Sequence, residues 1–238
     1  MALGTALRTL RNAQKTAKGV SFYSRCINRP LGRVLAAVAY RMGLTPNQVT
    51  GISGLFTFSA VASIACARPS WRLACAVYAA LAIGFAFDSA DGQLARLRGE
   101  SSAAGEWLDH VVDCAKITGL HAAVLVSFYR FFDLPGRGWL LLPLAFQSVA
   151  MLIFFGGLLT DHLKPKAAAG NTDAPLAGPS PLRALALLPV DYGVFCTVFM
   201  LLGNQRAFLA GYAALFAVHT VFLAAFMVKW YRELAAVR

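Results

Sequence analysis

Long apolar segments, separated by short polar stretches, recur along the chain from residue 49 onward. They cover residues 49–67, 73–95, 107–129, 138–160, 184–203 and 207–228. Each contains about 20 residues, the length that a helix needs to cross a hydrocarbon core of roughly 30 Å. The pattern therefore predicts an all-α integral membrane protein with six transmembrane helices.

The first 27 residues show a different periodicity, in which basic residues and leucines fall on separate helical faces: Arg8, Arg11, Lys15 and Lys18 on one, Leu3, Leu7 and Leu10 on the other. This predicts an amphipathic juxtamembrane helix over residues 1–27, lying on an anionic cytoplasmic leaflet. A basic tail without structure is the alternative, and no continuous apolar core marks a cleavable signal peptide. Residues 28–238 are then one six-helix transmembrane domain, with a linker at 28–48 and a cytoplasmic loop at 164–183.

Composition supports a membrane protein and explains the net charge. The 238 residues are 58% hydrophobic and 14% charged, whereas a soluble domain carries about a quarter charged residues. Of the 22 lysines and arginines, sixteen lie in segments on the side of the N-terminus and five on the opposite side. This asymmetry predicts both termini in the cytoplasm. The net charge of +11 is thus topological and does not indicate a nucleic-acid partner. The five cysteines show no CxxC spacing and are interpreted as small apolar filler.

Four aspartates lie within the second and third apolar segments. Asp88 and Asp91 are three residues apart, and Asp109 and Asp113 are four apart, so each pair shares one helical face. A charge near the bilayer centre costs roughly 2.5–3.5 kcal/mol, so cations must compensate these acids. Residues 97–104 are predicted to reverse the chain, which would bring all four carboxylates across a narrow gap near the cytoplasmic interface.

Four carboxylates favour hard cations such as Mg²⁺, Mn²⁺ or Ca²⁺ over zinc. Two divalent ions would balance their charge, and paired ions are a recurring device for phosphoryl transfer. Two other classes stay open at this point: a cation transporter that uses the acids as a permeation site, and a membrane scaffold without catalytic activity.

Small residues beside the acids leave room for a nucleotide. Gly92 and Ala95 leave a flat space on the acidic face, and Arg96 can reach a phosphate or one of the acids. Gly105 is expected to let the third helix pack tightly against the second.

The run from Asp88 to Asp113 resembles the signature of the CDP-alcohol phosphotransferases, with all eight fixed positions matched: Asp88, Asp91, Gly92, Ala95, Arg96, Gly105, Asp109 and Asp113. The resemblance implies that Asp88, Asp91 and Asp109 bind two Mg²⁺ or Mn²⁺ ions. It implies that Asp113 completes the metal site and takes the proton from the acceptor hydroxyl. The CDP contacts that it implies are Gly92, Ala95, Arg96 and Ser102, followed by Thr45, Pro46, Asn47 and Gln48.

The implied reaction belongs to phospholipid biosynthesis in the cytoplasmic (inner) membrane of a bacterium, with the site on the cytoplasmic side. An acceptor alcohol attacks the β-phosphorus of a CDP-linked lipid such as CDP-diacylglycerol, and CMP is released. Members of this family are often homodimers. For Thr45 or Asn47, capping of the helix that Pro46 begins is an equally good local interpretation.

The acceptor is the part that the motif leaves open between inositol phosphate, glycerol phosphate and a choline or ethanolamine type. His110 and Cys114 stand where other members carry subfamily-specific residues. The candidate acceptor residues are His110, Lys116, Arg183 and Asp191, although Lys116 inside a span is equally expected to pair with a carboxylate.

Overall fold

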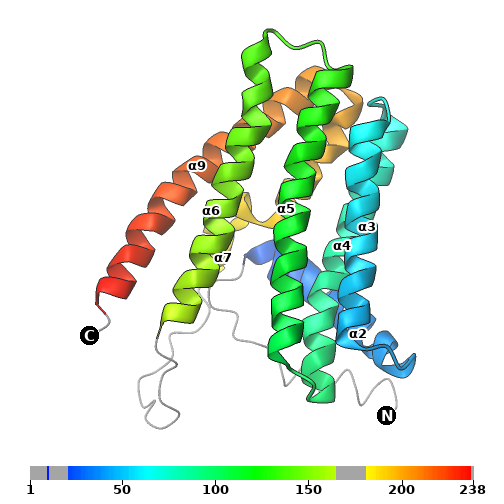
Figure 1. The fold of residues 1–238 in the computed structure, drawn as a ribbon, viewed down its shortest axis with the longest axis vertical. Helices are drawn as coiled ribbons and strands as arrows, with labels where there is room; N and C mark the ends of the chain where they lie inside the picture. The colour runs from blue at the N-terminus through cyan, green and yellow to red at the C-terminus, as the bar shows by residue number, and fades with distance from the viewer. Residues whose placement is uncertain (1–9, 11–20, 165–180, 237–238) are drawn as a thin grey trace.

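The computed structural model describes residues 10, 21–164 and 181–236, and these contain helices and no strand (Figure 1). In chain order the elements are η1 (Ser24–Asn28), α2 (Arg29–Arg41), α3 (Pro46–Cys66), α4 (Trp71–Arg98), α5 (Ala103–Phe131), η2 (Arg137–Leu140), α6 (Leu141–Leu163), α7 (Pro181–Ala186), η3 (Leu188–Val190), α8 (Tyr192–Thr197), η4 (Val198–Gly203) and α9 (Gln205–Ala235).

Five of the six predicted spans are present as helices that are long and apolar enough to cross a membrane. Within the described part of the chain these are α3, α4, α5, η2 with α6, and α9. In Figure 1, α3, α4, α5 and α6 run roughly along the long axis and α9 is inclined to them; the α4–α5 turn lies at one end and the α5–η2 connection at the other. The helical architecture expected from the hydropathy pattern is therefore confirmed for these five.

The predicted span at 184–203 is wrong as a single helix. The chain there forms four short helical pieces, α7, η3, α8 and η4, and the longest apolar stretch covers Tyr192–Gly203. At 1.5–2.0 Å per residue, that stretch extends about 20 Å, which is too short to cross a bilayer core as one helix. The broken segment nevertheless leads to the upper end of α9, whereas α6 ends at the lower end of the molecule in Figure 1. Pro189 supplies no backbone N–H, and Asp191 caps α8 by accepting a hydrogen bond from the Gly193 N–H at 2.7 Å.

Asp191 also anchors the segment that leads into η1. Its carboxylate accepts hydrogen bonds from the hydroxyls of Ser21 and Ser24, the second at 2.6 Å. The Tyr23 ring lies so close to Gly193 that a Cβ at that position would overlap with the ring. Burial, followed by the neighbouring Tyr78, raises the pKa of Tyr23 to about 12, so this phenol stays neutral beside the carboxylate. Gly193 and Asp191 thus allow the start of α8 to pack against the segment that leads into η1.

The amphipathic helix that the structure describes is α2, which falls in the predicted linker 28–48. Its small residues Gly32, Ala36 and Ala37 are buried, and Leu31 and Val34 are exposed. α2 crosses behind α4 in Figure 1 and packs against it, where a Cβ on Gly32 would approach Ser89 to 2.7 Å. Of residues 1–27, the structure describes Leu10, which is buried among α2 and α4 residues, and residues 21–27, which lead into and form most of η1. The charged face lies outside the described residues, so the surface helix stays a prediction.

α3 packs against both acid-bearing helices, α4 and α5. Its polar residues Ser53 and Thr57 are buried and face α4. The Ser53 hydroxyl donates to the Gly84 carbonyl at 2.8 Å, and a Cβ on Gly84 would lie 2.6 Å from the Thr57 hydroxyl. This close approach fixes α4 on one side of α3 and leaves the acidic faces of α4 and α5 beside two cavities.

Candidate active site

The four motif aspartates meet between the lower halves of α4 and α5. Carboxylate oxygens of Asp88, Asp91 and Asp109 all lie within 4.8 Å of one another. A second group with the same spacing joins Asp109 and Asp113 with a ring nitrogen of His110. Asp109 belongs to both groups. The helix spacing read from the sequence therefore does bring the acids together.

Asp91 is the most buried of these acids, with 5% of its surface exposed. The Thr50 hydroxyl on α3 donates to its Oδ2 at 2.7 Å, and the Gly92 N–H donates to its Oδ1. Each carboxylate oxygen of Asp91 thus accepts one hydrogen bond, which orients the group. Each oxygen also retains a second lone pair that can bind a cation. Burial of an acid without a cation is costly, so the arrangement suits a bound metal.

Lys116 supplies a cation from the protein itself. Its ammonium forms ion pairs with Asp88 and with Asp113, the latter at 3.1 Å, and the residue is 5% exposed. This is the structural pairing that the sequence left as one of two alternatives. It also holds Asp88 of α4 and Asp113 of α5 on opposite sides of one charge, which sets their separation.

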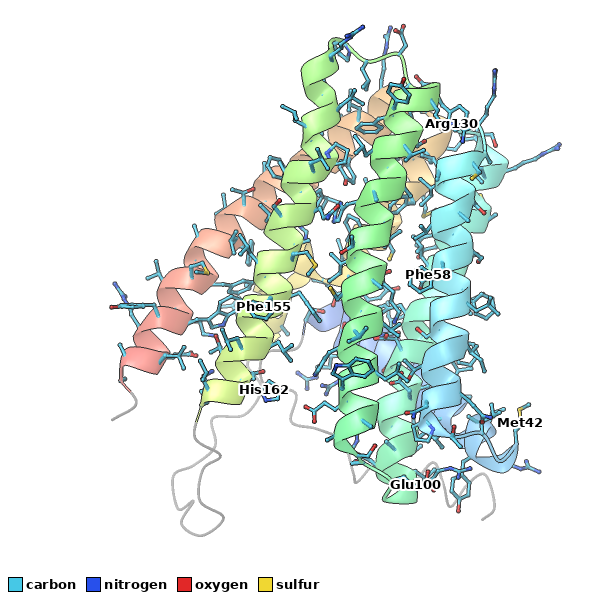
Figure 2. All side chains as sticks on the ribbon, viewed as in Figure 1. Met42, Phe58, Glu100, Arg130, Phe155 and His162 are labelled. Carbon is cyan, nitrogen blue, oxygen red and sulfur yellow. The ribbon has the colours of Figure 1, made fainter. Side chains whose placement is uncertain are left out.

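A groove of about 560 Å³, lined by both polar and apolar residues, opens on one side of the carboxylates. We call it the outer groove. It lies at the end of the molecule marked by Glu100 in Figure 2, opposite the end marked by Arg130. Its lining is formed by the start of α3, the end of α4 and the start of α5: Pro46, Asn47, Thr50, Asp91, Gly92, Ala95, Arg96, Glu100, Ser101, Ser102, Ala103, Gly105, Glu106, Asp109 and His110. Most of the predicted nucleotide contacts are in this lining.

An apolar cavity of about 180 Å³ lies on the other side of the carboxylates. We call it the inner chamber. Its lining comes from five helices: Thr57 of α3, Phe85 and Asp88 of α4, Asp113, Lys116 and Ile117 of α5, Phe154 of α6 and Tyr192 of α8. The acids therefore form a wall, with Asp91 and Asp109 toward the outer groove and Asp88 and Asp113 toward the inner chamber.

Two predicted nucleotide contacts are helix caps outside the groove lining. Thr45 and Gln48 form a capping box at the start of α3: the Thr45 hydroxyl accepts from the Gln48 N–H at 3.3 Å, and the Gln48 side chain accepts from the Thr45 N–H at 2.9 Å. The interpretation of Thr45 as a helix cap is thus confirmed.

Ser102 caps α5 by accepting a hydrogen bond from the Gly105 N–H at 3.1 Å, and it lines the groove as well.

Gly105 has a different neighbour from the one expected. A Cβ there would lie 3.4 Å from the Asn47 side chain and 3.2 Å from the Ser102 hydroxyl. The close approach is therefore between the first turns of α5 and α3, and α4 is not the partner. Asn47 is positioned at the groove wall by this contact.

The predicted acceptor residues are spread over several places. Lys116 lines the inner chamber, and His110 lines the outer groove. Asp191 lies in neither lining and makes the anchoring hydrogen bonds described above. Arg183 belongs to α7, but its side chain lies outside the part that the structure describes.

The sequence interpretation missed Thr50, Thr57, Phe85, Phe154 and Tyr192. For the two threonines a signal exists, because Thr50, Ser53 and Thr57 form a polar stripe at helical spacing within the apolar segment 49–67. No local pattern distinguishes the three aromatic residues from ordinary core residues.

Residues 43–230 match the family model of the CDP-alcohol phosphatidyltransferases. The chain belongs to this family. It is a CDP-alcohol phosphotransferase of phospholipid biosynthesis and a multi-pass membrane protein, as the signature and the hydropathy pattern predicted. No curated protein matches the chain significantly in sequence.

Two solved structures share the fold of this CDP-alcohol phosphotransferase. Both are of phosphatidylinositol phosphate synthase (PgsA1) from Mycobacterium tuberculosis. The one with CDP-DAG bound has a TM-score of 0.55 and 20% identity, over 86% of this chain and 94% of that one. The one in complex with manganese and citrate has a TM-score of 0.56 and 17% identity, over 86% and 89% of the two chains. At this identity the likeness concerns the fold.

Proposed function

We propose that the protein moves a phosphatidyl group from CDP-diacylglycerol, or a closely similar CDP-linked lipid, to an acceptor alcohol with release of CMP. The observation that carries this proposal is the carboxylate wall beside a groove that contains Gly92, Ala95 and Arg96. The likeness to a synthase with CDP-DAG bound supports the donor.

The donor set fits two divalent cations, Mg²⁺ or Mn²⁺. Hard oxygen ligands suit both ions, and the four carboxylates gathered around Asp109 would supply enough oxygen donors for two ions. Asp88, Asp91 and Asp109 would hold them, with Asp113 completing the set. Cations at this place would offset the negative charge of the diphosphate and of the leaving CMP.

The protein's own residues position the two substrates on opposite sides of this wall. Gly92 and Ala95 let the cytidine side of the donor approach the α4 backbone, and Arg96 and Ser102 meet the diphosphate. In the reaction the acceptor oxygen bonds to the β-phosphorus, the bond between that phosphorus and the oxygen bridging to CMP breaks, and the acceptor proton passes to Asp113. The inner chamber, which Asp113 lines, is the side from which we expect the acceptor hydroxyl to come.

The acceptor is a small alcohol of the inositol phosphate, glycerol phosphate or choline and ethanolamine type. The decisive experiment incubates purified protein with CDP-diacylglycerol, Mg²⁺ or Mn²⁺ and a panel of these alcohols, and measures CMP and new lipids by mass spectrometry. CMP and a lipid that contains the acceptor are expected with at least one alcohol, and EDTA should abolish both. An absence of CMP with every acceptor, in protein that binds CDP, would refute the proposed reaction.

We place the outer groove at the cytoplasmic face of the inner membrane, with both termini on that side. The distribution of lysine and arginine supports this orientation, and the exposed native cysteines test it. Cys66 and Cys75 lie near the α3–α4 connection, and Cys26 lies in η1. An impermeant maleimide should label Cys66 and Cys75 in intact cells and Cys26 only after permeabilisation. Labelling of Cys26 from outside would reverse the topology, and Cys26→Ser identifies that signal.

A homodimer is the expected assembly, because members of the family commonly form one. Light scattering of the detergent-solubilised protein, with the detergent contribution subtracted, should give twice the mass of one chain. A mass of one chain across the concentration range would contradict this assembly without affecting the proposed reaction.

A further inference from the structure

A second kind of ligand cluster lies at the rim of the outer groove. Glu106 and His110 are one turn apart on α5, with Oε1 and Nε2 3.9 Å from each other. His162 belongs to the last turn of α6 and is labelled near the lower end of that helix in Figure 2. One ligand atom from each of the three residues lies within 4.8 Å of the others. Two long helices, joined directly at their far ends, thus bring three metal-ligating groups together at their near ends.

The chemistry of this cluster differs from that of the carboxylate wall. Two imidazoles and one carboxylate are a ligand set that zinc takes with a fourth, open position, whereas Mg²⁺ and Ca²⁺ prefer oxygen ligands. Zinc ligands at 2.0–2.2 Å stand roughly 3.3 Å apart, so the three side chains must close by about 1–1.5 Å. Glu106 and His162 are exposed and can make most of that movement, whereas His110 is partly exposed and its ring lies edge-on to Phe154.

We propose that Glu106, His110 and His162 form a third metal site, selective for Zn²⁺ or a similar transition metal, that joins α5 to α6 at the rim of the outer groove. The site shares no residue with the carboxylates that hold the catalytic cations. His162 lies outside the groove lining, and so α6 would be linked to the groove residues only when a metal ion occupies this site.

The consequence of zinc binding is restraint of the groove rim. The end of α6 is already tied to α9, because Lys164 forms an ion pair with Glu233 at 2.7 Å. A zinc ion at the cluster would extend this tie to the first turns of α5, where Glu106 and His110 line the groove. His110 would also be drawn away from Asp109 and Asp113, its other possible partners. We therefore expect zinc bound at this rim to weaken donor binding.

Direct binding tests the site independently of turnover. Purified, EDTA-treated protein is first saturated with Mg²⁺ to occupy the carboxylates, and Zn²⁺ is then titrated by calorimetry. In parallel, Co²⁺ is added as a coloured substitute whose visible absorption reports nitrogen ligation. We expect one zinc site per chain, and in His162→Gln a loss of affinity of at least about tenfold, since even weaker outer contacts of a metal site account for 10–100-fold.

Asp161→Asn is the matched control, because Asp161 is adjacent on α6, exposed, and outside the cluster. It should bind zinc as the wild type does. Equal zinc affinity in His162→Gln and wild type, or no zinc binding above Mg²⁺ in the wild type, would overturn the proposal. In the transferase assay, His162→Gln should keep its basal activity and need at least about ten times more zinc for inhibition. Failure of the proposed reaction would leave the calorimetric and spectral results unchanged.

Discussion

The outer groove and the inner chamber lie on two sides of the same carboxylates and differ in almost every other respect. The groove is wide, has a mixed polar and apolar lining, and is built from the ends of three helices that are close in sequence. The chamber has about a third of its volume, is mainly apolar, and takes residues from five helices between Thr57 and Tyr192. In the proposed reaction, the groove would bind the nucleotide, which a short local motif can recognise. The chamber would bind the acceptor through side chains that only the fold brings together.

This difference explains how far the sequence could predict the site. The spacings within residues 88–113 determine helical faces directly, so the carboxylate wall and the groove floor at Gly92 and Ala95 followed from local periodicity. Phe154 and Tyr192 reach the chamber through helix packing over long sequence separations, which no local spacing encodes.

The fold divides in the same way. Helices α3, α4, α5, α6 and α9 were predictable because length and hydropathy suffice for a continuous span. The segment 184–203 has the composition of a span, but Pro189 and Asp191 interrupt it, and the partners that satisfy Asp191 are Ser21 and Ser24. These serines are about 170 residues away in the chain, so their pairing with a lone acid could not be read from the sequence.

The largest expected effect comes from Asp113, which touches the chamber side of the wall. Asp113→Asn removes the proposed proton acceptor, and we expect CMP release to fall roughly 10²–10⁴-fold. Metal-dependent CDP binding should stay within a few-fold, because Asp91 and Asp109 face the groove. Asp91→Asn is the comparison and should lose both CMP release and metal-dependent CDP binding. Equal losses of CDP binding in the two variants would show that Asp113 acts chiefly as a metal ligand.

A side chain at position 92 should affect the donor alone. Gly92 lines the groove, and among the described residues the side chain that comes within 4 Å of an added Cβ is Arg96, so Gly92→Leu projects into the proposed nucleotide space. We expect the KM for CDP-diacylglycerol to rise at least about tenfold, the ratio that about 1.4 kcal/mol produces. Gly51→Leu on α3 is the control, since its Cβ would meet no atom of the described part of the chain within 4 Å. An unchanged donor KM in Gly92→Leu would place the nucleotide elsewhere.

Filling the chamber should give the converse result. Ile117→Phe places a larger side chain in a cavity of about 180 Å³ and so reduces its free volume. We expect a several-fold rise in the KM for the acceptor with the donor KM unchanged. Val111→Phe, at an exposed position of the same helix, tests whether a phenyl ring on α5 is itself harmful. A rise in the donor KM alone would mean that the chamber holds part of the lipid donor.

The smallest expected effects come from two helix caps, of which one is also proposed to bind the donor. Ser102→Ala and Thr45→Ala each remove an N-cap, which should lower the free energy of unfolding by about 1 kcal/mol, measured from thermal melts in detergent. Only Ser102 lines the groove, so only Ser102→Ala should also raise the donor KM, by a few-fold. The same donor KM in both variants would restrict Ser102 to capping.

Lys116 has a consequence for how the protein is made. Lys116 lies on the same helix as Asp113 and reaches Asp88 once α4 and α5 come together. The ammonium partly neutralises the cluster at that stage, so helix association does not have to wait for metal. Membrane insertion and metal loading can therefore occur as separate events, with the lysine serving as an internal counter-ion between them.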